Sequence, residues 1–167
     1  MLIGVIADTH DNFGAAQAAT ELFHDEGVGV ILHCGDIIAP PMLEAFRGFE
    51  FHLVLGNNDG ETAGLRSTVA NLGAESTCHG RFAQLGFDGT RIAMLHGEDL
   101  DEVRAYAETG AYDFVLHGHH HEVRIEPVGE TTIVNPGGHF PTIPAEHRAV
   151  AIIDTETNEV TVRPLEE

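Results

Sequence analysis

Short apolar runs alternate with polar loops and helical patterns through the first half of the chain. The runs cover residues 2–7, 28–32 and 51–55, and each is short and mainly apolar. Runs of this kind are typical of strands that are buried on both faces. Helical patterns follow them over residues 15–26, 41–46 and 65–72. Three strand–loop–helix units in succession predict an α/β fold with parallel strands.

Local signals set the expected ends of the first two helices. Asn12 or Asp11 can cap the helix over residues 15–26, and Gly27 can end it. A proline stands in the first turn of the helix expected over residues 41–46, where its missing N–H costs nothing.

The second half of the chain carries strand patterns and one further helix. Strands are expected over residues 81–87 and 91–95, joined by a hairpin turn at Asp88-Gly89, and a helix with an acidic first turn over 99–108. Further strand patterns cover residues 112–116, 123–127, 131–134, 149–153 and 160–162. The sequence has no linker, low-complexity tract or internal repeat, so we expect a single domain over residues 1–167.

The composition of the 167 residues supports a folded globule. The hydrophobic fraction is 43%, which excludes disordered and fibrous architectures. No apolar run approaches the roughly 20 residues that cross a bilayer, and no basic segment precedes an apolar stretch at the N-terminus. Cys34 and Cys78 provide neither a disulfide framework nor a four-thiolate metal site. We therefore expect a cytoplasmic protein with no membrane span.

The charge of the chain is strongly negative. There are 27 acidic residues against 8 basic ones, all of them arginine, which gives a formal net charge of -19. The protein could be merely acidic, but the complete lack of lysine favours adaptation to concentrated salt, because halophiles use high net charge to stay soluble. No cluster of basic residues is present to displace counterions from phosphates, so long nucleic acid is not an expected partner.

Residue types that bind metals follow the ends of five predicted strands. They are Asp8 with His10, then Asp36, Asn57, His96, and the pair His119 and His121. Ligands of open α/β sheets gather where the carboxyl ends of strands meet, so these distant positions can converge. Imidazole with carboxylate and amide oxygen, and no thiolate, suits Mn, Fe, Zn, Ni, Co or Mg. Seven ligands exceed one tetrahedral site, and a shared carboxylate divides them between two ions about 3.5–4 Å apart.

Each of these motifs also has a structural interpretation. Asp8 and Asp36 could cap helices, Asn57 belongs to a turn-like Asn-Asn-Asp-Gly segment, and a lone His96 could simply be packed. These interpretations do not explain why five such motifs stand at the ends of five apolar runs. The joint pattern favours a dinuclear metal site.

The ordered set of motifs resembles the calcineurin-like metallophosphoesterase superfamily. The set reads D-x-H, G-D, G-N-x-D, H-G and G-H-x-H, and its spacing is similar to that of the small prokaryotic YfcE-type phosphodiesterases, which share a fold with a retromer subunit. The resemblance covers residues 1 to about 153 and includes an Asn135-Pro136-Gly137 turn. It implies a four-layer α-β-β-α sandwich with two mixed sheets.

The resemblance also implies roles for individual residues. Asp8, His10 and His121 would hold a first ion, Asp36 would bridge both ions, and Asn57, His96 and His119 would hold the second. The implied reaction is hydrolysis of a phosphate ester by a hydroxide that bridges the two ions, with both ions acting as Lewis acids. The catalytic residues expected on this basis are Asp36, Asn57 and Asn58.

Two positions depart from the family pattern. Asn58 stands where many members have a histidine that is proposed to protonate the leaving oxygen, so we expect slow turnover and a preference for diesters with acidic leaving groups. Gly138 stands where relatives usually have serine, which puts in doubt one contact expected with the phosphate or behind the ligands.

Several neighbouring residues keep two interpretations at this point. His117 and His119 also form an H-x-H pair, but Gly118 favours the pairing of His119 with His121, with His120 pointing away. His33 is either a support behind the ligands or a packed loop residue. Asp59 holds an imidazole or anchors its loop, and nothing in the spacing places His139 and Phe140.

Two functions are compatible with this sequence. The first is a dinuclear metal-dependent phosphodiesterase, with Mn as the expected metal, that acts on a small or nucleotide-like phosphate ester. The alternative is a protein-docking module on the same fold, like the retromer subunit, with a weak or vestigial metal site. A docking module is free to lose ligands, so the presence of a competent residue at all seven positions favours the enzyme. A homo-oligomer is also compatible with this sequence.

Overall fold

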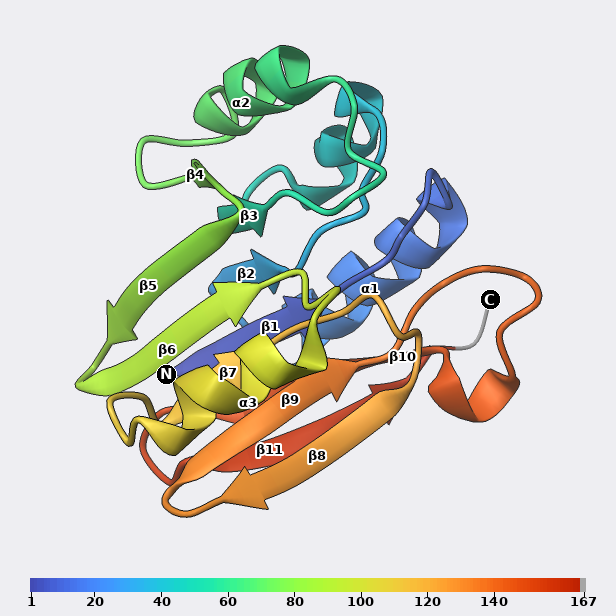
Figure 1. Cartoon of the computed structure of the whole chain (residues 1–167). Helices are drawn as coiled ribbons and strands as arrows, with labels where there is room; N and C mark the ends of the chain where they lie inside the picture. The colour runs from blue at the N-terminus through green and yellow to red at the C-terminus, as the bar shows by residue number, and fades with distance from the viewer. Residues whose placement is uncertain (166–167) are drawn as a thin grey trace.

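The computed structural model describes residues 1–165, which form two β-sheets with helices on their outer faces (Figure 1). The first sheet has six strands in the order β11-β10-β1-β2-β3-β4. Strands β1 to β4 are parallel, and β10 and β11 add antiparallel partners on the other side of β1. The bounds are β1 Leu2–Ile6, β2 Val30–His33, β3 Glu50–Val54, β4 Thr77–Gly80, β10 Ala149–Asp154 and β11 Glu159–Pro164.

The second sheet has five strands in the order β5-β6-β7-β9-β8. Its centre is parallel, and both of its edges are antiparallel. The bounds are β5 Phe82–Phe87, β6 Thr90–Leu95, β7 Phe114–Leu116, β8 Val123–Val128 and β9 Thr131–Pro136. The predicted hairpin between β5 and β6 turns at Asp88 and Gly89, which both have positive φ (50° and 89°), as a tight hairpin turn requires. The prediction of two mixed sheets is therefore confirmed.

Three apolar clusters hold the layers together. The largest joins the outer face of the first sheet to α1 (Phe13–Asp25), the short 3-10 helix η1 (Pro40–Phe46) and α2 (Thr62–Ala70). A second cluster lies between the sheets, where Val5 and Leu32 of the first share a core with Met94 and Leu116 of the second. The third joins the second sheet to α3 (Leu100–Glu108). This gives the α-β-β-α order of layers that was expected.

The structure differs from the predicted elements at a few places. The second helix is a 3-10 helix, and a short strand, β4, was not expected because its four residues mix polar and small side chains. A 3-10 turn, η2 (Ala145–His147), was also not expected. The first helix begins at Phe13, where the Asn12 Oδ1 accepts a hydrogen bond from the Ala15 N–H at 3.1 Å. Among the described residues, no helix is both long and apolar enough to span a membrane.

Candidate metal centre

The seven predicted ligands come together at one edge of the two sheets. Each lies in a loop that follows a strand: β1, β2 and β3 of the first sheet, and β6 and β7 of the second (Figure 1). The loops after these strands carry, in that order, Asp8 and His10, Asp36, Asn57, His96, and His119 and His121. Contacts between these loops bring together residues more than 110 positions apart, as between His119 and Asp8.

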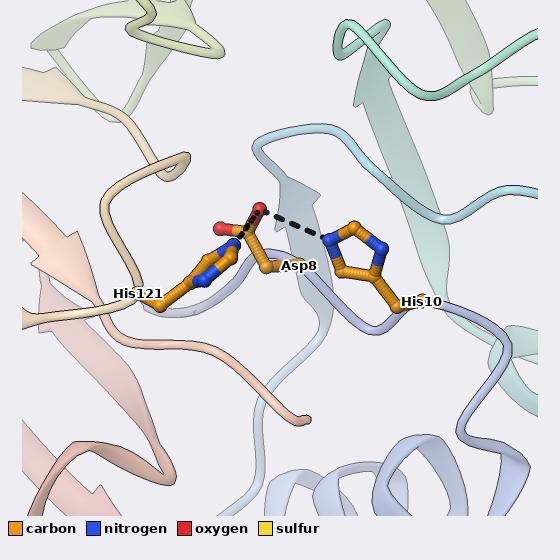
Figure 2. A group of neighbouring side chains, drawn as sticks. All are labelled: Asp8, His10 and His121. Carbon is orange, nitrogen blue, oxygen red and sulfur yellow. Dashed lines mark ion pairs between the residues drawn. The ribbon is translucent and has the colours of Figure 1, made fainter. Parts of the chain in front are cut away.

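Asp8 lies between two histidines in the first half of the centre. Its Oδ1 is 3.2 Å from the Nε2 of His121 and 3.6 Å from the Nε2 of His10, so both rings point at one carboxylate oxygen (Figure 2). The His10 Nε2 also lies 3.3 Å from the Asp36 Oδ2. Asp8, His10 and His121 therefore present three ligand atoms close enough to hold one ion.

The second half of the centre is built around His96. Its Nε2 is 3.4 Å from the Asp36 Oδ2 and 3.1 Å from the Asn57 Oδ1. The His119 Nδ1 is 3.0 Å from the same Asn57 oxygen. The His96 Nδ1–H donates to the carbonyl of Cys34 at 2.8 Å, which leaves the lone pair of Nε2 facing the centre.

Two carboxylates stand between the halves. Asp36 is within 3.4 Å of both His10 and His96. The Asp8 Oδ1 is also 4.0 Å from the His96 Nε2, so Asp8, Asp36 and His96 form a second group able to hold an ion. The structure thus places Asp8 near both halves, where the family pattern gave a bridging position to Asp36 alone.

The electrostatics of the centre fit divalent cations. The Asp8 Oδ1 and the His10 Nε2 are buried, and outside this cluster of carboxylates and imidazoles neither atom has a hydrogen-bond partner. Burial alone opposes ionisation of Asp8, but His10 and His121 outweigh it and lower the pKa of that carboxyl to about 2. Burial likewise opposes protonation of His10, yet Asp36 and Asp8 raise its pKa to about 9. An environment that stabilises an imidazolium between two carboxylates also stabilises a metal ion there, which can take the place of the proton.

The loops reach this arrangement through unusual backbone conformations. Five of the seven residues have positive φ, a region that non-glycine residues rarely adopt: Asp8 (54°), His10 (43°), Asp36 (58°), His119 (66°) and His121 (52°). Such strained residues cluster at functional sites, where the surrounding structure holds them. Gly118 allows the last loop to approach, because a Cβ at this position would lie 2.5 Å from the Asp8 Oδ2. The backbone N–H of His119 donates to the same oxygen at 2.9 Å.

Asp59 braces two of the ligand loops. Its Oδ2 accepts from the N–H groups of Asp36 (2.9 Å) and Gly56 (2.7 Å), and its Oδ1 accepts from the N–H of Ile38 (2.8 Å). The sequence left open whether Asp59 holds an imidazole or anchors its loop, and the structure shows that it anchors the loop. The loop that follows β2 and carries Asp36 is thereby tied to the loop that carries Asn57.

Asn58 contacts the shared carboxylate. Its side-chain amide donates to the Asp36 Oδ2 at 2.7 Å, and its backbone N–H donates to the Asp36 Oδ1 at 2.9 Å. Burial raises the pKa of Asp36, but His10, His96 and these two N–H groups together hold it well below its usual range. Asn58 therefore orients Asp36 and keeps it ionised.

The other histidines of the region lie outside the centre. The His117 Nδ1–H donates to the carbonyl of Gly118 and the His120 ring to that of Gly97, both at 3.1 Å, so the structure brings His119 and His121 to the centre and not His117. His33 is fully buried, accepts from the Gly35 N–H and donates to the Thr9 hydroxyl. Burial lowers the pKa of His33 to about 3, so it stays neutral behind the ligand loops.

One support was missed in the sequence. The Asn135 side-chain amide donates to the carbonyl of Gly118 at 3.1 Å and so holds the loop of His119 and His121. The Asn135 Oδ1 also accepts from the Gly137 N–H at 3.0 Å. The Asn-Pro-Gly turn was visible in the sequence, and its contact with the ligand loop was not.

Comparisons with a family model and with known proteins point to the same family. Residues 1–158 match the model of the calcineurin-like phosphoesterase superfamily domain. The chain is 31% identical to phosphodiesterase MJ0936 of Methanocaldococcus jannaschii over 95% of this chain and 96% of that protein. It is 32% identical to a probable metallophosphoesterase of Methanothermobacter thermautotrophicus, over 86% of this chain and 79% of that protein.

Solved structures share the fold. A structure described as a novel archaeal phosphodiesterase superimposes with a TM-score of 0.90 at 30% identity, over 99% of this chain and all of that one. The phosphoesterase YfcE of E. coli gives a TM-score of 0.66 at 17% identity, over 99% of this chain and 100% of that one. Vps29 of Chaetomium thermophilum gives a TM-score of 0.68 at 18% identity, over 98% of this chain and 96% of that one. At these lower identities the last two show a common fold alone.

Proposed function

Because this chain belongs to the calcineurin-like phosphoesterase superfamily and is a phosphoric ester hydrolase, we propose that it hydrolyses a small or nucleotide-like phosphodiester at a centre of two divalent ions. We assign the first ion to Asp8, His10 and His121, and the second to Asn57, His96 and His119. Asp36 contributes to both. Mn is the metal we expect first, because this mixture of oxygen and imidazole ligands suits it.

One observation carries the proposal. Five strand ends deliver carboxylate, amide and imidazole groups to one point, and two of the atoms there, the Asp8 Oδ1 and the His10 Nε2, are buried with no hydrogen-bond partner outside this cluster. Buried polar atoms in native proteins nearly always have partners, so two such atoms that lie 3.6 Å apart and contact only other candidate ligands support an ion at this point.

The residues of the chain divide the work of such a centre. When bound, the two ions would supply Lewis acidity toward the phosphoryl oxygens and activate the attacking water. Asp36 stays ionised because Asn58 and the neighbouring imidazoles stabilise its charge. Asn57 places its oxygen between His96 and His119. The cations would offset the carboxylates and create a local site for an anion on a protein of net charge -19.

The leaving group determines how fast this centre can work. The side-chain amide of Asn58 is directed at Asp36 and has no proton to give to an alkoxide. The departure of a poor leaving group then lacks general-acid assistance from this residue. We therefore propose diesters with acidic leaving groups as the best substrates.

Hydrolysis of bis(p-nitrophenyl) phosphate by metal-free protein, with Mn added back or chelator present, tests the proposal. We expect Mn-dependent release of nitrophenolate and about two bound Mn per chain by elemental analysis. Asp36→Ala and His119→Ala should lose the activity. His24→Ala is the matched control, because this histidine is highly exposed on α1 and should change nothing.

The result can also favour the docking alternative. Folded wild-type protein that binds no metal and shows no hydrolysis with Mn, Ni, Co or Mg would refute the phosphodiesterase. Vps29 proteins share this fold. Protein docking would then be the function to test next.

A further inference from the structure

We infer that Phe140 is a positioning residue that sets the ring orientation of His10 and His121 and thereby the affinity of the centre for its first ion. The inference rests on the proposed assignment of these histidines to that ion. The Phe140 ring centroid is 3.8 Å from that of His10, with 33° between the ring planes. It is 5.1 Å from that of His121, in an edge-to-face arrangement at 62°. One aromatic side chain thus contacts both histidines on either side of Asp8.

The histidines of the two halves are oriented in different ways. His96 is fixed by the hydrogen bond from its Nδ1 to the carbonyl of Cys34. Among the described residues, no such bond from the ring of His10 or His121 to a backbone carbonyl is present. Metal-binding histidines nearly always donate their second ring N–H to a partner, and this bond fixes the orientation of the ring. Here the face and the edge of Phe140 provide that restraint by packing.

Hydrogen bonds hold the segment that carries Phe140 against the loop of Asp8 and His10. The N–H of His139 donates to the carbonyl of Asp8 at 3.0 Å. The Asn12 amide donates to the carbonyl of His139 at 3.0 Å, and the N–H of Ile143 donates to the carbonyl of Phe140 at 3.0 Å. These bonds fix the backbone on both sides of the aromatic ring.

Gly138 explains how this segment comes so close. A Cβ on Gly138 would lie 3.2 Å from the Asp8 Cβ and 3.2 Å from the Cδ2 of His121. It would also lie 3.0 Å from the Cδ1 of Ile143, so three neighbours would have to give way. A side chain at this position would therefore require shifts of a few tenths of an ångström in these neighbours. The glycine thus lets the segment of Phe140 lie directly against Asp8 and His121.

Metal titration by calorimetry tests the inference, with Mn as the probe and metal-free protein. The second ion is removed in a His96→Ala background, because His96 belongs both to the proposed second site and to the group of Asp8, Asp36 and His96, so that the remaining binding reports the first ion. There we expect Phe140→Ala to weaken Mn binding by about tenfold, which is the usual loss when a support behind a ligand is removed. Phe140→Tyr keeps the flat ring and should restore the affinity, and Phe140→Leu should fall between the two.

Two controls separate positioning from general damage. In a His121→Ala background, where the second ion remains, Phe140→Ala should leave Mn binding unchanged. Phe82→Ala removes an aromatic ring that packs on Tyr106 at 4.7 Å, and it should leave both ions unaffected. Equal Mn affinity for Phe140→Ala, Phe140→Leu and the unchanged Phe140 in the His96→Ala background overturns this inference alone. Wild-type protein that binds no Mn overturns the proposed function together with it.

Discussion

Removal of the Asp59 carboxylate should weaken the fold and the centre together. Asp59 is 6% exposed and accepts three backbone N–H groups, of which those of Asp36 and Gly56 are fully buried. Each buried N–H left without a partner costs about 1–3 kcal/mol. Asp59→Ala should therefore lower the free energy of unfolding by about 2–6 kcal/mol. In Asp59→Asn the amide oxygen can still accept two of these bonds while its NH2 faces the Ile38 N–H, so the loss should be about 1–3 kcal/mol.

Urea unfolding with chelator present measures this effect without a contribution from bound metal. Asp113→Ala is the matched control, because Asp113 also accepts a backbone N–H, that of Arg91 at 2.7 Å, together with the Arg91 guanidinium, but at a position that water reaches. We expect Asp113→Ala to lower the free energy of unfolding by less than about 1 kcal/mol. Because Asp59 joins the loops of Asp36 and Asn57, kcat/KM should fall in the same order, with Asp59→Ala lowest. Equal unfolding free energies for Asp59→Ala and Asp113→Ala would refute the reasoning.

Asn58→His introduces an imidazole at the position where many relatives carry one, and should speed hydrolysis of diesters with poor leaving groups by up to about 100-fold while changing nitrophenyl esters little. Equal effects on both substrates would contradict the role assigned to the leaving group. At a net charge of -19, raising KCl from about 0.1 M to about 1 M shortens the screening length from about 10 Å to about 3 Å and should raise the urea midpoint. A lower midpoint would count against adaptation to salt. Burial, with the adjacent His52, lowers the pKa of His79, so the unfolded chain binds more protons below about pH 6.5 and stability should fall as the pH drops through that value. Urea titrations should show a smaller fall for His79→Gln than for the wild type.

The sequence predicted the parts of the structure that follow from general rules. Apolar runs gave the central strands because a strand buried on both faces needs apolar side chains throughout, and the parallel order placed their polar ends at one edge. The strand β4 was missed because its Thr-Cys-His-Gly sequence carries no apolar run. The helix over residues 41–46 was expected without its 3-10 form, since two prolines remove N–H groups without specifying the turn.

Contacts between loops depended on details that a single sequence does not carry. The order of motifs named the seven residues at the centre, but it did not show that Asp8 also reaches the second half. The direction of each side chain depends on positive φ values at individual non-glycine residues such as Asp8 and His121, which sequence patterns do not encode. For the same reason Phe140 had no expected place, although it packs directly on His10.

The left-handed backbone at five of the seven residues has a consequence for evolution in the laboratory. Each such residue is held at a cost of about 1–3 kcal/mol, and glycine at the same position relieves much of it. A selection that rewards only heat resistance, without demanding activity, should therefore accumulate glycine or asparagine at His10, His119 and His121 before it changes the core. Thermostable variants of this chain would then have to be screened for both properties at once, because stability and activity compete at the same backbone positions.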